Sequence, residues 1–263
     1  MRNNFVNLPD SFLAKPIAHR GFHNCKNFEK FGKGPENSRE SVTEAMGFGF
    51  GVEIDVCFSK DYVPVVIHDQ NLIRLCKKNI NVFDSFATDL FKSSLKNGEF
   101  LPSLEEILSL VNGRASLLIE IKIRKKDQDI QLIAKKIAHL IRNYTGPVAL
   151  MSFDWSLVKA FAKKISDIPR GLITQGFDQN SQSLISDHEK SGIKENNLLT
   201  YGISFISHYY GDLSEDFYKR NALANRKVLS WTVCTKEIAK RVKKKCDNIT
   251  FEGFCPQTKK VRV

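Results

Sequence analysis

The sequence predicts an α/β protein, a (β/α)8 or TIM barrel with its active site at the carboxyl ends of the strands, and three observations lead to this fold class. Short apolar runs rich in valine and isoleucine alternate with longer stretches of helical periodicity. Several of these runs are hydrophobic without interruption, which is typical of parallel strands that are covered on both faces. About eight such repeats in 263 residues match the size of this barrel.

The candidate strands are short apolar runs bounded by polar or turn-forming residues. They are residues 16–19, 52–56, 64–68, 116–121, 147–152, 170–174, 202–207 and 227–233. A further apolar segment, residues 248–251, makes one candidate more than the barrel has places. We therefore expect one of the later candidates not to be a strand.

The candidate helices lie between these runs, and two of them have clear start signals. They are residues 38–47, 103–111, 127–143, 155–165, 214–224 and 235–244. Pro35 and Ser38 precede the first helix, and Ser103 precedes the second with Glu106 three residues later. Serine is a preferred N-cap residue, and an acidic side chain favours the positive end of a helix. These signals support the alternation of strands and helices.

The chain is expected to form a single barrel domain over residues 1–263. A polar, lysine-bearing stretch at about 71–100 has no place in the repeat and predicts a small insertion over the barrel mouth. The polar segment 178–197 predicts an exposed loop with a short helix. No apolar run is long enough to span a bilayer, and polar residues interrupt the first fifteen positions where a signal peptide would have its apolar core. A cytoplasmic location is therefore expected.

The net charge of +11 favours an acidic partner, which could be a phosphate ester, an anionic membrane surface or nucleic acid. We find no nucleic-acid module beside the charges, so nucleic acid is not expected. Lysines and arginines gather at 240–245, which predicts a solvated helix face or, alternatively, a weak contact with an anionic membrane. The six cysteines form no Cys-x-x-Cys pair and are expected to be reduced. The oligomeric state stays open.

Four polar clusters stand where apolar strand candidates end. They are His19-Arg20-Gly21, Glu53-Ile54-Asp55, His68-Asp69 and Glu120-Ile121-Lys122. Residues two apart on a strand point to the same face, so Glu53 and Asp55 should face one way, and Glu120 should face the same way as Lys122. Each cluster alone is common at a solvated surface. Four of them at successive strand ends indicate one shared site.

The carboxylates of Glu53, Asp55 and Glu120 would repel one another without a cation, and oxygen ligands alone favour Mg²⁺ or Ca²⁺. One such ion together with Arg20 and Lys122 would leave the site with one positive charge, the complement of a phosphodiester. Arginine can hold phosphate oxygens in a bidentate manner, and lysine acts as a point charge.

Two histidines complete the predicted chemistry. His19 and His68 could serve as general base and general acid on opposite sides of the phosphorus, and the sequence does not assign which is which. His23 is expected to be a loop residue. His208 follows an apolar run, so it could line the site or be a packed histidine at a strand end.

At these residues the sequence resembles the glycerophosphodiester phosphodiesterase family. The matching segments are Ala18-His19-Arg20-Gly21, Pro35-Glu36-Asn37-Ser38, Val52-Glu53-Ile54-Asp55-Val56, Pro64-Val65-Val66-Ile67-His68-Asp69, Leu101-Pro102-Ser103-Leu104-Glu105-Glu106, Leu118-Ile119-Glu120-Ile121-Lys122, Trp231-Thr232-Val233 and Ile249-Thr250-Phe251-Glu252. The resemblance spans nearly the whole chain and is most specific as far as Lys122.

The resemblance implies hydrolysis of a glycerophosphodiester to an alcohol and glycerol 3-phosphate with one divalent cation, directly or through a cyclic phosphate. Its implied residue roles agree with those above for the metal ligands, the histidine pair and the phosphate-binding cations. In addition, Glu36 and Asn37 would lie near the metal or orient its ligands, and Trp231 would line the substrate pocket. The chain departs from the family pattern in the loop 22–34, at 75–78, and at Glu252, where many members have aspartate.

Two alternatives stay open beside hydrolysis of a small glycerophosphodiester. Lysophospholipase D-type hydrolysis of a lysophospholipid would need an apolar groove beside the metal, supplied by the loops 22–34 and 71–100. A non-catalytic barrel that binds phosphate or a membrane would be favoured if a histidine or a metal carboxylate were missing. The sequence carries all of them.

Overall fold

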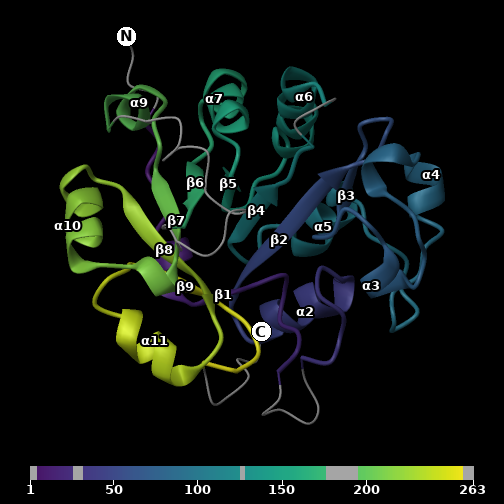
Figure 1. Cartoon of the computed structure of the whole chain (residues 1–263), viewed down its shortest axis with the longest axis horizontal. Helices are drawn as coiled ribbons and strands as arrows, with labels where there is room; N and C mark the ends of the chain where they lie inside the picture. The colour runs from purple at the N-terminus through teal and green to yellow at the C-terminus, as the bar shows by residue number, and fades with distance from the viewer. Residues whose placement is uncertain (1–4, 26–31, 125–127, 176–194, 257–263) are drawn as a thin grey trace.

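The computed structural model describes residues 5–25, 32–124, 128–175 and 195–256, and they form a closed barrel surrounded by helices (Figure 1). The strands are β1 (Ile17–Ala18), β2 (Gly51–Phe58), β3 (Pro64–Val66), β4 (Leu117–Ile121), β5 (Val148–Ser152), β6 (Arg170–Thr174), β7 (Phe205–Tyr209), β8 (Lys227–Val233) and β9 (Asn248–Phe251). Their order is β1-β9-β8-β7-β6-β5-β4-β2-β3, and β1 also pairs with β2. All strands but β3 pair in parallel, so eight parallel strands close the predicted TIM barrel.

The surplus strand is β3, so the expectation that a later candidate is not a strand was wrong. β3 pairs antiparallel with β2, with Val66 opposite Val56, and it stands outside the ring. Only residues 59–63 connect the two strands, whereas a parallel crossover needs about a dozen residues or more. The segment 248–251 forms β9, which closes the barrel by pairing Phe251 with Ala18 of β1.

All six predicted helices are present, with bounds close to those expected. They are α2 (Arg39–Gly47), α5 (Leu104–Val111), α6 (Ile130–Ile141), α7 (Trp155–Lys164), α10 (Glu215–Leu223) and α11 (Lys236–Val242). Short helices are α1 (Ser11–Ala14), α3 (Ile73–Cys76), α4 (Ala87–Leu90) and α9 (Glu195–Thr200), with 3-10 turns η1 (Val82–Asp84) and η2 (Tyr210–Asp212). The Ser38 and Ser103 side chains cap α2 and α5 as predicted. None of the described helices combines the length and the apolar character that a membrane crossing needs.

Strand alternation divides the side chains between two cores. Outward-facing residues such as Ile54 and Ile119 pack against the helices. Inward-facing residues such as Leu118, Phe205 and Leu229 fill the lower half of the barrel interior with an apolar plug. Polar inward-facing residues are therefore confined to the carboxyl ends of the strands, above this plug.

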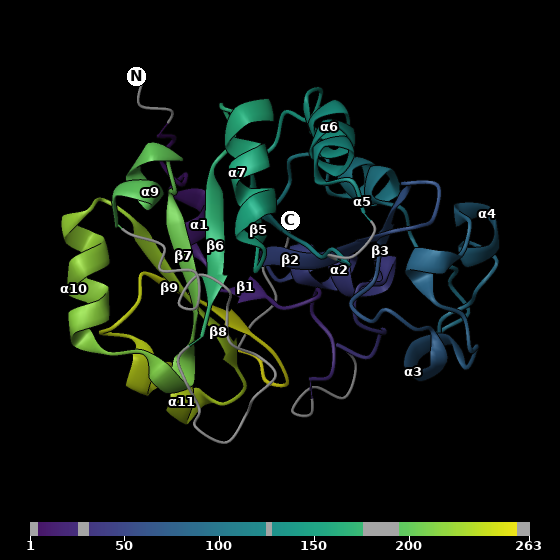
Figure 2. The ribbon, with the colours of Figure 1, turned by 45° about the horizontal axis from the view of Figure 1, so that its top comes forward.

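The insertion at 71–100 carries α3, η1 and α4 and flanks the barrel mouth instead of covering it (Figures 1 and 2). Leu72, Phe83 and Leu90 form a separate apolar cluster with Val65 and Ile67. Because the β2–β3 hairpin projects beyond the barrel, the segment that packs on β3 is displaced sideways. Of the predicted loop 178–197, residues 178–194 lie outside the described part of the chain.

We expect Gly171→Ala to destabilise the barrel by about 1–3 kcal/mol, the usual cost of overpacking a core. A Cβ atom at this position of β6 would lie 2.2 Å from the ring of Phe205, which is fully buried in the apolar plug. Urea unfolding would measure the loss. The double variant Gly171→Ala/Phe205→Leu removes the clash and should lose less than the sum of the single changes. Strict additivity would contradict this packing.

Candidate active site

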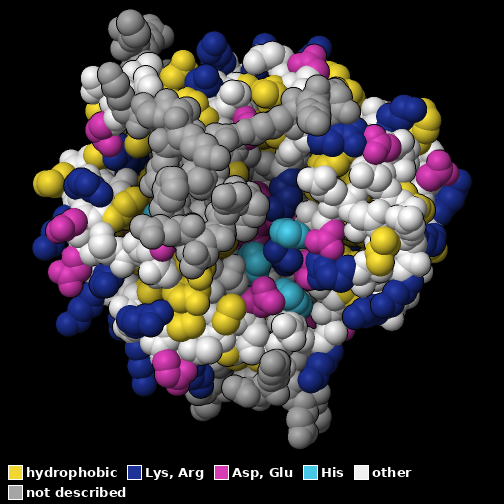
Figure 3. All heavy atoms as spheres, viewed as in Figure 1, with side chains coloured by type: hydrophobic (Ala, Val, Ile, Leu, Met, Phe, Trp, Pro, Cys, Tyr) yellow, Lys and Arg dark blue, Asp and Glu magenta, His cyan; other side chains and the backbone are white. Residues whose placement is uncertain are grey.

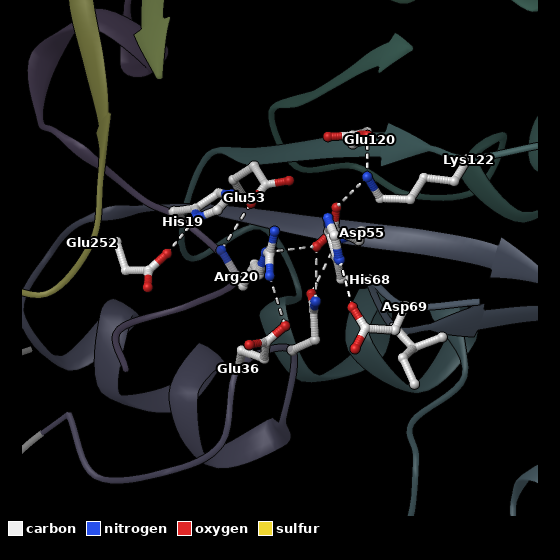
Figure 4. Close-up of polar contacts among 12 residues, drawn as sticks. His19, Arg20, Glu36, Glu53, Asp55, His68, Asp69, Glu120, Lys122 and Glu252 are labelled. Atoms are coloured by element: carbon white, nitrogen blue, oxygen red, sulfur yellow. Dashed lines mark hydrogen bonds and ion pairs between the residues drawn. The ribbon is translucent and has the colours of Figure 1, made fainter. Parts of the chain in front are cut away.

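The four predicted polar clusters meet at one end of the barrel, around a cavity of about 930 Å³ that is lined by His19, Arg20, Glu53, His68 and Glu120, among others. Figure 3 shows histidine, acidic and basic side chains gathered in this hollow, and Figure 4 shows their contacts. The polar groups come from β2, from β4 and from the turns after β1 and β3. The site therefore lies at the carboxyl ends of the strands, as the barrel fold predicts.

Glu53, Asp55 and Glu120 converge as predicted. One oxygen of each carboxylate lies within 4.8 Å of the others, and all three residues are buried. The register of β2 and β4 accounts for this, because it sets Asp55 directly opposite Glu120. Glu53, two residues before Asp55 on β2, points the same way into the barrel.

The three carboxylates are in different electrostatic environments. Burial would raise the pKa of Asp55, but Lys122 and Arg20, at 3.2 and 3.1 Å from its two oxygens, hold the pKa below its usual range. Burial raises the pKa of Glu53 well above its usual range, and the negative charges of Asp55 and Glu120 add to this. Glu53 Oε1 has no hydrogen-bond partner in the described part of the chain. A buried, unpartnered oxygen within an all-oxygen donor set fits a hard divalent cation.

Arg20 is placed by an unusual turn. Its φ of 55° and the φ of 78° at Gly21 turn the chain sharply after β1. A Cβ atom on Gly21 would lie 2.4 Å from Ser41 Oγ, so α2 can approach only a glycine here. The turn lets the Arg20 backbone amide donate to Glu53 at 2.8 Å while its side chain reaches Asp55.

Lys122 lies on the other side of the cluster and donates to Glu120 and contacts Asp55. Burial would lower the pKa of Lys122, but the carboxylates of Glu120 and Asp55 raise it above its usual range. The ammonium group is therefore charged, and the predicted pair of cations does stand beside the carboxylates.

Each predicted histidine is held through Nδ1 by a carboxylate. His19 Nδ1 lies 2.7 Å from Glu252, and its Nε2 lies 4.0 Å from Glu53 (Figure 4). His68 Nδ1 lies 2.8 Å from Asp69. A carboxylate partner favours a proton on Nδ1 and leaves Nε2 to act as base or, once protonated, as acid.

Glu36 and Asn37 support the cluster from the turn before α2. Asn37 and Asp55 form two reciprocal hydrogen bonds of 2.9 and 3.0 Å, so the amide fixes the orientation of that carboxylate. Glu36 accepts from Arg20 at 2.8 Å and from Arg74 at 2.6 and 2.7 Å. Neither residue belongs to the group of three acidic side chains that converge.

Sequence reasoning did not assign site roles to Glu252, Asp69 or Arg74. Burial disfavours ionisation of Glu252, but the hydrogen bond with His19 outweighs it and lowers its pKa to about 2. Arg74 bridges Asp69 and Glu36 and so connects the His68 turn to the α2 turn. Asp69 follows His68 directly, and Glu252 stands in the last motif of the resemblance, but neither signal indicates which imidazole each carboxylate meets.

The structure distinguishes the positions of Trp231, His23 and His208. Trp231 lines the cavity, as predicted. His23 is a loop residue but is buried, with Nε2 3.8 Å from Glu252. His208 faces away from the site, because it hydrogen bonds with Thr174 at 2.6 Å and stacks on Phe217 of α10. Of the two roles left open for His208, the structure shows the packed one.

Fold and site together define a TIM-barrel enzyme with an acidic cluster at the mouth. The chain belongs to the glycerophosphoryl diester phosphodiesterase family, whose model matches residues 19–250. This membership places the chain among the phosphodiesterases and agrees with the resemblance seen in the sequence.

Individual relatives show the extent of the likeness. A glycerophosphodiester phosphodiesterase of Bacillus altitudinis is 28% identical over 172 residues, which cover 62% of this chain and 67% of that protein. A human lysophospholipase D is 25% identical over 174 residues, 60% of this chain and about half, 51%, of that protein. The structure of an Oleispira antarctica phosphodiesterase in complex with the product sn-glycerol-3-phosphate superposes with a TM-score of 0.76 at 20% identity, covering 93% and 94% of the two chains. At this identity the superposition establishes the fold.

We expect Glu252→Gln to lower the free energy of unfolding at pH 7 by about 1 kcal/mol. The pKa shift alone would give a larger loss, but solvent screens the partly exposed side chain and reduces it. The folded pKa of about 2 lies below the ordinary value of 4.5, so the stabilisation is complete above about pH 5 and disappears as the pH falls towards 2. Urea unfolding at pH 7, 5 and 3 would show the two proteins converging in acid. The exposed Glu105→Gln is the control, and a difference that stays constant with pH would contradict the pairing.

Proposed function

We propose that this protein hydrolyses glycerophosphodiesters to an alcohol and glycerol 3-phosphate with the help of one divalent cation, Mg²⁺ or Ca²⁺. The observation that carries the proposal is the convergence of three buried carboxylates within 4.8 Å, beside two cations and two imidazoles that line one cavity. The family membership supports the reaction class.

The acidic cluster would hold the ion through Glu53, Asp55 and Glu120, and Asn37 would keep Asp55 oriented. When bound, such an ion polarises a phosphoryl oxygen and offsets the negative charge that develops on it. Arg20 Nε and Nη1 contact Asp55 and Glu36, which leaves Nη2 without a partner among the described residues and available to a phosphate oxygen. Lys122, the residue after β4, adds a second positive charge.

The imidazoles would move the protons. One unprotonated Nε2 accepts a proton from the attacking oxygen, which is either water or the glycerol hydroxyl of the substrate. The other imidazole gives a proton to the oxygen of the leaving alcohol. Glu252 and Asp69 stabilise the positive charge on whichever ring is protonated, because each carboxylate already accepts from Nδ1.

A second candidate is hydrolysis of a lysophospholipid, and one observation favours it. Met151, Phe153, Ile173 and Trp231 form an apolar side of the cavity. This surface comes from the barrel strands and the residue after β5. The described residues of the loops 22–34 and 71–100 do not line the cavity, and residues 26–31 of the first loop lie outside the described part of the chain. A human relative bears the name lysophospholipase D.

Four further expectations from the sequence belong with these proposals. A non-catalytic barrel is disfavoured because both histidines, Glu53 and Glu120 line one cavity, and Asp55 is buried beside the two glutamates. Hydrolysis of a small-molecule ester requires no nucleic-acid partner, so none is proposed. A cytoplasmic location and a weak contact of the basic residues at 240–245 with an anionic membrane stay predictions, and Lys240, Lys243 and Lys244 are exposed enough for that contact.

Glu53→Gln and Glu120→Gln should each abolish turnover that depends on a divalent cation, because each removes a charged ligand from the same small site. Phosphate-ester hydrolysis would be followed after EDTA treatment and after adding back Mg²⁺ or Ca²⁺, together with metal content by mass spectrometry. Glu105→Gln, an exposed acid on α5, is the matched control. Full activity of either site variant in EDTA would overturn the role of the metal.

His19→Ala and His68→Ala should each lower kcat by about 100-fold or more, the usual scale for loss of a general acid or base. His139→Ala, an exposed histidine on α6, should keep the wild-type rate. The substrates would be glycerophosphocholine, glycerophosphoethanolamine, glycerophosphoglycerol and a lysophospholipid. Unchanged hydrolysis in both site variants would remove the proposed proton transfers.

A further inference from the structure

Two aromatic rings, those of Phe153 and Trp231, line a part of the cavity that the proposed chemistry does not use, and a third ring, Tyr209, supports Trp231. Phe153 and Trp231 meet nearly at right angles, with ring centroids 5.6 Å apart and planes at 89°. Tyr209 lies behind Trp231 at 5.7 Å and 57°. The rings belong to β7, β8 and the residue that follows β5, and Tyr209 is the register partner of Trp231. We call these three residues the aromatic corner.

Trp231 and Tyr209 lie across the barrel from the acidic cluster, whereas Phe153 follows β5, the neighbour of β4. In the closed ring of eight strands, β8 stands four places from β4, and β7 stands four places from β2. Trp231 is fixed there, because its indole N–H donates to the carbonyl of Ser207 at 2.9 Å. A phosphodiester with its phosphorus at the carboxylates can therefore direct one of its two substituents along the cavity towards these rings.

The charges around the aromatic corner favour a cation. Among the described cavity-lining residues from β5 to β9 there is no lysine, arginine or histidine, and the carboxylate there, Asp154, caps α7 by accepting from the Leu157 amide. Met151 and Ile173 line the cavity between the rings and the floor. The described surface is thus apolar, rich in π-electron density and without a positive charge, while Arg20 and Lys122 stand beside the carboxylates.

We propose that the aromatic corner binds a quaternary ammonium group, so that choline is the preferred leaving alcohol. This inference rests on the proposed function and names its substrate class. A trimethylammonium group has no N–H donors and interacts favourably with aromatic faces. A primary ammonium carries three donors, and aromatic faces offer no strong acceptors for them, so ethanolamine would lose hydrogen bonds to water on entering. A glycerol headgroup meets the same obstacle with its hydroxyl groups.

The first experiment compares kcat/KM for glycerophosphocholine, glycerophosphoethanolamine and the 3,3-dimethylbutyl ester of glycerol phosphate, an uncharged isostere of the choline ester. We expect the choline ester to exceed both others by about tenfold or more, the scale of a desolvated cation–π contact. An isostere that is hydrolysed as well as the choline ester would show an apolar surface without charge selection. Equal rates for ethanolamine and choline would also overturn the proposal.

Variants then test the rings themselves. Trp231→Leu and Phe153→Leu should reduce the preference for choline over ethanolamine, mainly through KM, and Trp231→Phe should retain part of it. Phe86→Leu, an exposed aromatic residue on the insertion, is the control and should keep the wild-type preference. Lysophosphatidylcholine carries the same headgroup and also an acyl chain. A faster rate with this substrate would show that the rest of the cavity binds the acyl chain, and it would agree with binding of the headgroup at the rings.

A binding measurement keeps this inference separate from the proposed reaction. The chain has two tryptophans, so in Trp155→Phe the fluorescence reports Trp231 alone. Titration with tetramethylammonium should change that signal saturably, and ammonium at equal ionic strength should not. Saturable binding without hydrolysis of any ester would contradict the proposed function but support the quaternary ammonium site. Hydrolysis without such binding, and without a preference for choline, would overturn the site alone.

Discussion

The structure of the site depends on how three buried carboxylates are kept together. Arg20 and Lys122 contact the two oxygens of Asp55 from opposite sides, and they supply two positive charges against three negative ones. The remaining imbalance falls on Glu53, whose pKa is raised and whose Oε1 has no hydrogen-bond partner among the described residues. The protein thus stabilises most of the cluster with its own cations and leaves one charge for an ion to balance.

The β2–β3 hairpin is what brings the carboxylates within reach of one another. Neighbouring strands lie about 4.8 Å apart, so a barrel strand between β2 and β4 would separate Asp55 from Glu120 by about 10 Å. Because β3 turns back outside the ring, β2 pairs directly with β4 and sets these two residues opposite each other. The connection 59–63, too short for a crossover, therefore determines the geometry of the site.

The sequence was sufficient to predict the features that depend on local periodicity. It did not predict the contacts that form only when the barrel closes. Spacing by two along a strand was enough to align Glu53 with Asp55, and the apolar runs marked every strand. The apolar character of residues 64–68 did not identify them as a hairpin partner, since an antiparallel edge strand is as apolar as a barrel strand. The short connection 59–63 was the local signal for a hairpin, and the sequence interpretation did not use it. Glu252 reaches His19 across 233 positions, a contact that depends on the pairing of β9 with β1.

Closure of the barrel and the proposed proton transfer therefore depend on the same strand pair. β9 joins β1 with Phe251 opposite Ala18, and the next residue of each strand, Glu252 and His19, forms the hydrogen bond that orients the imidazole. Trp231 on the arc opposite the carboxylates and Phe153 after β5 add apolar surface to the cavity, and a drier cavity strengthens every charge interaction at the phosphorus. A parallel ring is suited to this arrangement, because neighbouring strands present their ends at one level. Charged groups from β2 and β4 and aromatic side chains after β5 and on β8 can then line the same cavity.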